Sequence, residues 1–267
     1  MYGAILGDII GSPYEFDRSG KTKQFPLFSS ESRFTDDTVM TIAVADAFLK
    51  LSPGTPDDHI CNQLIQSMQH FGRAYPTIGY GAKFLAWLMT DSPRPYGSWG
   101  NGSAMRVSAV GWIFDDLDTV LKMASLSATV SHDHPEAVKG AQATAAAVFL
   151  ARTGHTKTDI KAYIEHRFVY DLSRTCDQIR PGYRHDVSCR GTVPEAITAF
   201  LEGQDFEDVI RTAVSLGGDC DTLTCIAGAM AEGFYGVPDH LKEICRSYLP
   251  PDLLDVVIRF EQRTAHR

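Results

Sequence analysis

Apolar residues recur at intervals of three and four along most of the chain, which is typical of α-helices packed on a common core. The segment 35–51, TDDTVMTIAVADAFLKL, places Val39, Ile42, Ala43 and Ala47 on one face. The segment 135–152, PEAVKGAQATAAAVFLAR, begins with proline, which suits a first helical turn, and is rich in alanine, the strongest helix former. Its small residues on most faces predict a central, closely packed helix.

Further helical patterns cover residues 57–71, 104–114, 117–129, 158–166, 193–201, 206–215, 223–235, 238–248 and 251–263. No convincing run alternates β-branched with polar residues, and the residues around Val187 come nearest to one. Loops are expected at 12–34, 72–80, 90–103 and 171–192. We therefore predict an all-α fold, in which about a dozen helices form a single compact domain over residues 1–267.

Composition and charge exclude several classes of protein. The chain has 25 Lys and Arg against 33 Asp and Glu, a net charge of −8, so broad electrostatic binding to nucleic acid is not expected. It has no stretch of 18 apolar residues and no basic segment before its apolar start, so neither a membrane span nor a signal peptide is expected. Six cysteines without CxxC spacing indicate reduced thiols, and we expect a cytoplasmic protein, with a monomer favoured.

Two acidic segments give the strongest indication of chemistry, 34–38 (FTDDT) and 216–222 (LGGDCDT), which lie about 180 residues apart. Taken alone, each is typical of a helix start, where acids are favoured by the helix dipole. If the two segments meet, their oxygen atoms select Mg²⁺, Mn²⁺ or Ca²⁺, and four carboxylates together favour a two-metal site because they would otherwise repel one another. Gly217 and Gly218 allow the backbone to bend before the second segment. The candidate metal ligands are Thr35, Asp36, Asp37, Asp219, Asp221 and Thr222.

A glutamate in the loop after the first helix, Glu15, is a further candidate. A lone loop glutamate usually faces solvent. Beside a metal pair it would instead act as a base or as a carboxylate that gates the metals.

The segment 96–106, YGSWGNGSAMR, is a glycine-rich loop that runs into a helix. Such a junction offers backbone N–H groups and a positive helix end to a phosphate or diphosphate, although no Walker motif is present. Trp99 could stack on a base, and the alternative is a tight loop with a packed tryptophan. His132 and His134 have the spacing of a zinc pair, but no third soft ligand is near, and a role close to a helix start is favoured over zinc.

Together the segments GDIIGSPYEF, FTDDT, GNGSAMR, SHDHPEAVKGA and SLGGDCDT, in this order, resemble the ADP-ribosylglycohydrolase family over nearly the whole chain. The resemblance implies a single all-α domain around two Mg²⁺ or Mn²⁺ ions and hydrolysis of the bond between ADP-ribose and an acceptor. It implies metal binding by Thr35, Asp36 and Asp37 from one side and by Asp219, Asp221 and Thr222 from the other. Either Glu15 or one of the aspartates, Asp36 first among them, would activate or orient water.

The same resemblance implies substrate contacts. His132 would help to hold ADP-ribose, and Trp99 would stack on the adenine. The diphosphate would lie on the loop formed by Gly97, Ser98, Trp99, Gly100, Asn101 and Gly102. Arginine on an ADP-ribosylated protein is the first choice of acceptor, and serine, a nucleic-acid base or a small molecule are alternatives. A catalytically inactive ADP-ribose-binding protein is the alternative of another class.

Overall fold

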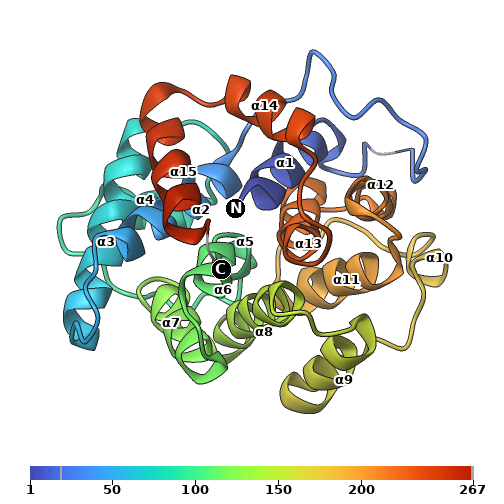
Figure 1. The fold of residues 1–267 in the computed structure, drawn as a ribbon. Helices are drawn as coiled ribbons and strands as arrows, with labels where there is room; N and C mark the ends of the chain where they lie inside the picture. The colour runs from blue at the N-terminus through green and yellow to red at the C-terminus, as the bar shows by residue number, and fades with distance from the viewer. Residues whose placement is uncertain (19, 266–267) are drawn as a thin grey trace.

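In the computed structural model, which describes residues 1–18 and 20–265, helices pack around one centre (Figure 1). The elements are α1 (Tyr2–Gly11), η1 (Ser12–Tyr14), α2 (Asp36–Leu49), α3 (Asp57–Ala74), α4 (Ala82–Met89), α5 (Gly102–Met105), α6 (Ser108–Ile113), α7 (Leu117–Thr129), α8 (Pro135–Arg152), α9 (Lys157–Phe168), α10 (Cys176–Ile179), α11 (Cys189–Glu202), α12 (Phe206–Leu216), α13 (Cys220–Tyr235), α14 (Asp239–Tyr248) and α15 (Pro251–Thr264).

The predicted all-α fold is confirmed. The described residues contain no strand, and their one isolated bridge pairs Gly100 with Ser188, beside the Val187 region that came nearest to a strand pattern. Buried apolar side chains from all parts of the chain form one hydrophobic core, as expected of a single compact domain. All six cysteines are free thiols, and five of them are buried.

Several helix boundaries differ from the predicted ones. The helix expected at 104–114 is divided into α5 and α6, and the break falls at Arg106, whose side chain is fully buried. The helices α4 and α10 were not predicted, and α11 and α13 begin a few residues earlier than expected. The early start of α13 places Asp219 at its N-cap. Local propensity continues across 104–114, so tertiary packing decides this break.

The predicted central helix, α8, is buried along most of its length, and α13 lies beside it (Figure 1). The helices α1 and α13 approach each other closely. An added Cβ at Gly7 would lie 2.2 Å from the Thr224 carbonyl oxygen, and one at Gly11 would lie 2.7 Å from the Asp221 Cα. Only glycine permits this approach, and it brings Asp8 of α1 next to Asp221 of α13.

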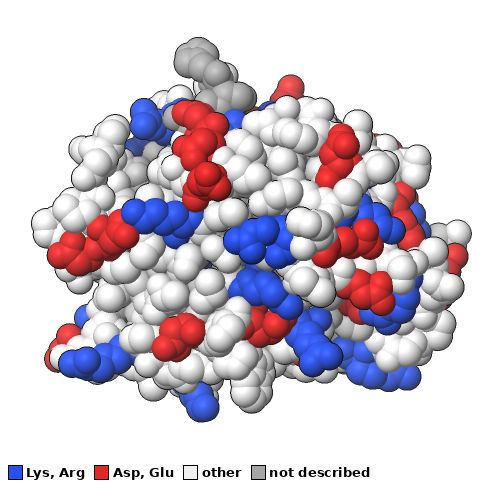
Figure 2. Space-filling view, turned by 90° about the horizontal axis from the view of Figure 1, so that it is seen from below, with Lys and Arg blue, Asp and Glu red and all other residues white. Residues whose placement is uncertain are grey.

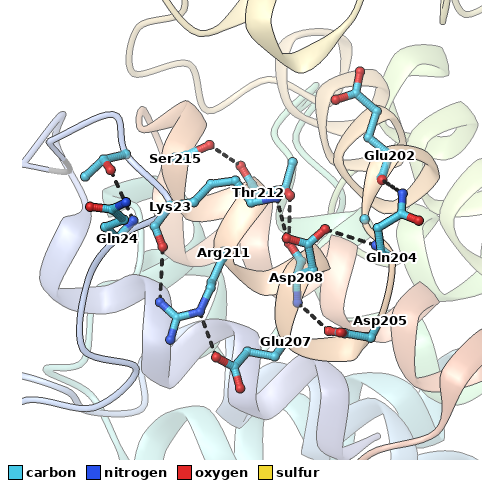
Figure 3. Close-up of polar contacts among 12 residues, drawn as sticks. Lys23, Gln24, Glu202, Gln204, Asp205, Glu207, Asp208, Arg211, Thr212 and Ser215 are labelled. Carbon is cyan, nitrogen blue, oxygen red and sulfur yellow. Dashed lines mark hydrogen bonds and ion pairs between the residues drawn. The ribbon is translucent and has the colours of Figure 1, made fainter.

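The loop after η1 is anchored to α12. Arg211 donates to the carbonyl oxygen of Lys23 (3.1 Å) and pairs with Glu207 on its own helix (Figure 3). It also donates to the carbonyl oxygen of Phe25 (2.7 Å). Lys21 Nζ donates to three carbonyl oxygens from the segment 180–183 and the end of α12. These contacts hold the long segment that carries Glu15 against the body of the protein.

The surface has no extended region of one charge on the face that Figure 2 shows, where acidic and basic side chains alternate. Within residues 1–18 and 20–265, every helix is too short or too polar to cross a lipid bilayer.

Candidate active site

The structure brings the two acidic segments together at the first turns of α2 and α13. Thr222 Oγ1 donates a 3.1 Å hydrogen bond to Asp37 Oδ2. Gly217 and Gly218 both have positive φ, 77° and 76°, and so form the bend before α13 that the sequence suggested. At this bend an added Cβ at Gly218 would lie 2.5 Å from the Tyr183 ring.

A buried carboxylate that the sequence analysis did not assign, Asp8, organises the start of α2. Asp8 accepts hydrogen bonds from Thr35 N (2.8 Å), Thr35 Oγ1 (2.7 Å), Thr38 N (3.1 Å) and Thr38 Oγ1 (2.5 Å). Thr35 Oγ1 also caps the helix by accepting from Asp37 N. The available signal was a single acid inside the apolar run of the first helix, which no spacing rule interprets.

Two groups of three carboxylates have oxygen atoms within 4.8 Å of one another. One group contains Asp8, Asp37 and Asp221, and the other contains Glu15, Asp219 and Asp221. Asp221 belongs to both, so the groups are adjacent. Asp36 belongs to neither, although its charge contributes to raising the pKa of Asp37.

Burial raises the pKa of every carboxylic acid in this cluster, and repulsion by neighbouring cluster members adds to the rise at four of them, Glu15, Asp36, Asp37 and Asp221. Burial, followed by the charge of Asp221, raises the pKa of Asp37 well above its ordinary value, and burial with Asp219 does the same for Asp221. Burial and Asp8 raise the pKa of Asp36 to about 8, and burial and Asp219 raise the pKa of Glu15. Such a cluster is stable in its ionised form only with cations among its members.

The cluster also fits a hard divalent cation by its donor atoms. Asp37 Oδ1 is buried and has no hydrogen-bond partner among the described residues. A buried carboxylate oxygen without a partner is costly, and a bound cation would satisfy it. The atoms that the cluster offers as metal ligands are carboxylate and hydroxyl oxygens, which suit Mg²⁺ or Mn²⁺ rather than zinc.

A cavity of about 460 Å³ opens onto these carboxylates, a size typical of small-molecule sites. Of the predicted residues, Thr35, Gly97 and Trp99 do not line it. Its lining residues are Glu15, Phe16, Asp36, Asp37, Gly79, Gly81, Ala82, Lys83, Phe84, Tyr96, Ser98, Gly100, Asn101, Gly102, Met105, Arg106, His132, His185, Val187, Asp219, Asp221 and Thr222.

The glycine-rich loop is tied to its neighbours by backbone contacts that the sequence did not indicate. Gly97 N donates to Asp133 Oδ1 (2.7 Å), and Asn101 N donates to the Val187 carbonyl (2.8 Å). The N–H groups of Ser98 and Gly102 have no partner among the described residues and are available to a ligand. The loop therefore offers fewer donors than its glycine content suggests.

The Asn101 side chain connects this loop to the carboxylates. Its Nδ2 donates to Asp219 Oδ2 (2.5 Å) and to Thr192 Oγ1 (3.0 Å). The residue was predicted to bind substrate, and the structure places its side-chain amide on Asp219. Asn101 thereby fixes the orientation of one carboxylate of the cluster.

The aromatic and imidazole side chains near the glycine-rich loop differ in their exposure and in whether they line the cavity. Trp99 is 60% exposed, and its ring contacts His134. His134 caps α8 by accepting from Glu136 N (3.1 Å). His132 is buried and lines the cavity. Neither histidine belongs to a group of potential metal ligands in the described part of the chain, which leaves zinc without support.

The segment after α3, to which the sequence assigned no role, forms part of the site. Gly79, at φ 125°, lies against Asp36, and an added Cβ would be 2.7 Å from Asp36 Oδ1. A larger residue here would displace that carboxylate. Phe84, from the unpredicted helix α4, lines the cavity and contacts the His132 ring at 5.7 Å between centroids.

Comparison with known proteins gives consistent matches over the whole chain. The family model described as ADP-ribosylglycohydrolase matches residues 1–266. ADP-ribosylhydrolase ARH3 of Bos taurus is 27% identical, with 95% of this chain and 89% of that protein covered, and the Homo sapiens protein of the same name is 26% identical, with 95% and 90% covered. ADP-ribosylarginine hydrolase Tri1 of Pseudomonas putida is 25% identical, with 96% and 72% covered. A solved structure titled ADP-ribosylglycohydrolase-related protein complex superposes with a TM-score of 0.69 at 22% identity, covering 98% of this chain and 95% of the other, which shows a shared fold.

Proposed function

The chain belongs to the ADP-ribosylglycohydrolase family, and we propose that it hydrolyses the glycosidic bond between ADP-ribose and an acceptor in the cavity described above. The observation that carries this proposal is the convergence of five carboxylates and a glycine-rich loop on one cavity. The carboxylates suit a centre where positive charge develops, and the loop suits the diphosphate.

The carboxylates would hold two Mg²⁺ or Mn²⁺ ions. Support comes from the partnerless Asp37 Oδ1, from the two adjacent groups that share Asp221, and from the raised pKa values of the cluster. Asp36, Asp37, Asp219, Asp221 and Thr222 would be the ligands, since all five line the cavity. Thr35 uses its hydroxyl on Asp8 and caps α2, so it would contribute through the remaining lone pair. Bound there, the cations would neutralise the carboxylates and polarise substrate oxygens.

Hydrolysis breaks the bond between the anomeric carbon and the acceptor and joins that carbon to a water oxygen. Glu15 would take a proton from this water, because it lines the cavity beside Asp219 and burial raises its pKa. Asp36 is the second candidate to activate or orient this water. The proton taken from the water would pass to the departing acceptor, so that free ADP-ribose and the protonated acceptor are released. The surrounding carboxylates would stabilise the oxocarbenium-like transition state.

The rest of the cavity would hold the ADP moiety. The free N–H groups of Ser98 and Gly102 would bind diphosphate oxygens, and His132 would lie beside them. The side chain of Trp99 is exposed and does not line the cavity, so Trp99 would stack on the adenine only if the adenine lies outside the cavity. Phe84 and Tyr96 are the aromatic residues that the cavity itself offers.

ADP-ribosylated arginine on protein is the acceptor that we propose, with support from the name of the Pseudomonas putida relative. The relatives named only as ADP-ribosylhydrolases leave serine, nucleic-acid and small-molecule linkages as alternatives. One release assay distinguishes them, with arginine-, serine- and DNA-linked ADP-ribose compared in Mg²⁺, in Mn²⁺ and in EDTA. Release from arginine alone supports the proposal, and release from another linkage corrects the acceptor. ADP-ribose binding without release from any substrate would identify an inactive binding protein.

A further inference from the structure

Arg106, at the end of the glycine-rich segment, carries a buried positive charge without an acidic partner among the described residues. Its side chain is 0% exposed, with Cζ 5.6 Å from the centre of the Phe84 ring. Nη2 donates to the Ser127 carbonyl (2.7 Å) and to Ser131 Oγ (2.9 Å), while Nε and Nη1 have no partner among the described residues. Because burying an unpaired charge is energetically costly, we expect the two hydrogen bonds that Arg106 makes to fix its position.

The contact with Ser131 continues to His132. Ser131 Oγ lies 2.8 Å from His132 Nδ1, and the Ser131 side chain is also fully buried. Arg106 can only donate, so it occupies an acceptor position of the serine oxygen. The serine hydroxyl proton then needs an acceptor, and Nδ1 is the one at hydrogen-bond distance in the described part of the chain. Nδ1 is therefore unprotonated, and the ring carries its proton on Nε2.

The protonated nitrogen faces the glycine-rich loop. An added Cβ at Gly102 would lie 3.1 Å from His132 Nε2, and one at Gly100 would lie 3.6 Å from it. Burial and the Arg106 charge lower the pKa of His132 well below its ordinary value, so the ring is neutral at physiological pH. A neutral imidazole can donate into the cavity only when the proton is on Nε2.

We propose that Arg106 is a positioning residue which, through Ser131, holds His132 as the Nε2–H tautomer and thereby presents a hydrogen-bond donor to an anionic oxygen of the ligand. The inference rests on the proposed function for the nature of that oxygen, which would belong to the diphosphate of ADP-ribose. The chain of hydrogen bonds from Arg106 through Ser131 to His132, which we call the relay, depends only on the contacts among these three side chains.

The test combines nitrogen NMR of the full-length protein with calorimetry. In protein with ¹⁵N-labelled histidine, the wild type should show a protonated Nε2 and a hydrogen-bonded, unprotonated Nδ1 for His132, identified by the loss of its signals in His132→Gln. Ser131→Ala should change the Nδ1 resonance or produce a mixture of tautomers. The same variant should bind ADP-ribose about tenfold more weakly, the effect of one hydrogen bond. Arg106→Met should change the Nδ1 resonance in the same direction.

Ser108→Ala is the matched control, because Ser108 is equally buried, lies near Arg106 in the chain, and has a hydroxyl without a partner in the described residues. It should leave both readouts unchanged. A wild-type Nδ1–H tautomer would overturn the proposal, as would a Ser131→Ala variant with wild-type resonances and affinity. If ADP-ribose does not bind the wild type, the proposed function fails, and the His132 resonances still decide whether the relay exists.

Discussion

Thr222 Oγ1 donates to Asp37 Oδ2 across 185 positions of the chain and joins the first turn of α13 to that of α2. This contact directs both carboxylate-bearing turns into one cavity. It also leaves Asp37 with a second, buried oxygen that has no partner within the described residues. A buried carboxylate oxygen without a partner favours a cation as the missing neighbour.

Without divalent cations, stability should fall as pH rises. The pKa of Asp36 is about 8 in the folded protein against an ordinary 3.8, so the folded state holds this proton more tightly than the unfolded state. The stabilisation is complete below the unfolded pKa and is lost as pH rises through the folded one. In EDTA, the melting temperature should therefore decrease between about pH 5 and pH 9.

Saturating Mg²⁺ should remove most of this decrease, because cations replace the protons. Asp36→Asn should also reduce the slope in EDTA, whereas the exposed Asp58→Asn should not. Identical slopes in EDTA and in Mg²⁺ would mean that the carboxylates hold no cation.

Removing Asp8 should loosen the start of α2. Asp8→Ala leaves the N–H and hydroxyl groups of Thr35 and Thr38 without their acceptor in a fully buried position. Urea unfolding should show a loss of at least about 3 kcal/mol, since four buried donors lose their acceptor and each unsatisfied group costs about 1–3 kcal/mol. Asp8→Asn, which retains one acceptor oxygen, should lose less. Unchanged stability in Asp8→Ala would contradict the supporting role.

The amide of Asn101 should matter for metal affinity. Asn101→Ala removes the donor that orients Asp219, and supporting residues of this kind typically change metal affinity by about 10–100-fold. Mn²⁺ titration by calorimetry measures this directly. Asn62→Ala, the same change on the exposed side of α3, is the control. Equal Mn²⁺ affinity in the two variants would show that Asp219 needs no such support.

The close approach of α1 and α13 should be sensitive to one methyl group. Gly7→Ala places a Cβ 2.2 Å from the Thr224 carbonyl oxygen, and the two helices must separate. The free energy of unfolding should fall by about 1–3 kcal/mol or more, as in other overpacked cores. Gly182→Ala has open space around the new methyl group and should be nearly neutral. Equal stability in both variants would rule out the tight helix contact.

The fold class was predictable because helical periodicity is a local property, expressed in every long segment from 35–51 onward. The sequence predicted a metal site only on the condition that the two acidic segments meet. Similar acidic helix starts, with Asp36 and Asp37 in one and Asp219 and Asp221 in the other, suggested a common ligand. The role of Asp8 could not, because a lone carboxylate acquires its partners only when α1 packs on its neighbours.

The same limit applies to the glycine-rich loop. Its predicted free N–H groups are partly used by Asp133 and Val187, which approach from other segments of the chain. The break between α5 and α6 likewise follows from the burial of Arg106 rather than from local propensity. Contacts that depend on tertiary packing leave no periodic signal in the sequence.

We propose that this cavity releases ADP-ribose from an acceptor with the help of cations bound by its carboxylates. The most direct measurement compares ADP-ribose release from ADP-ribosyl-arginine protein by wild type and Asp37→Asn, each in Mg²⁺ and in EDTA, with circular dichroism to verify folding. We expect release by the wild type in Mg²⁺ only, and none by the folded variant in either buffer. Full release by Asp37→Asn, or by the wild type in EDTA, would contradict the account.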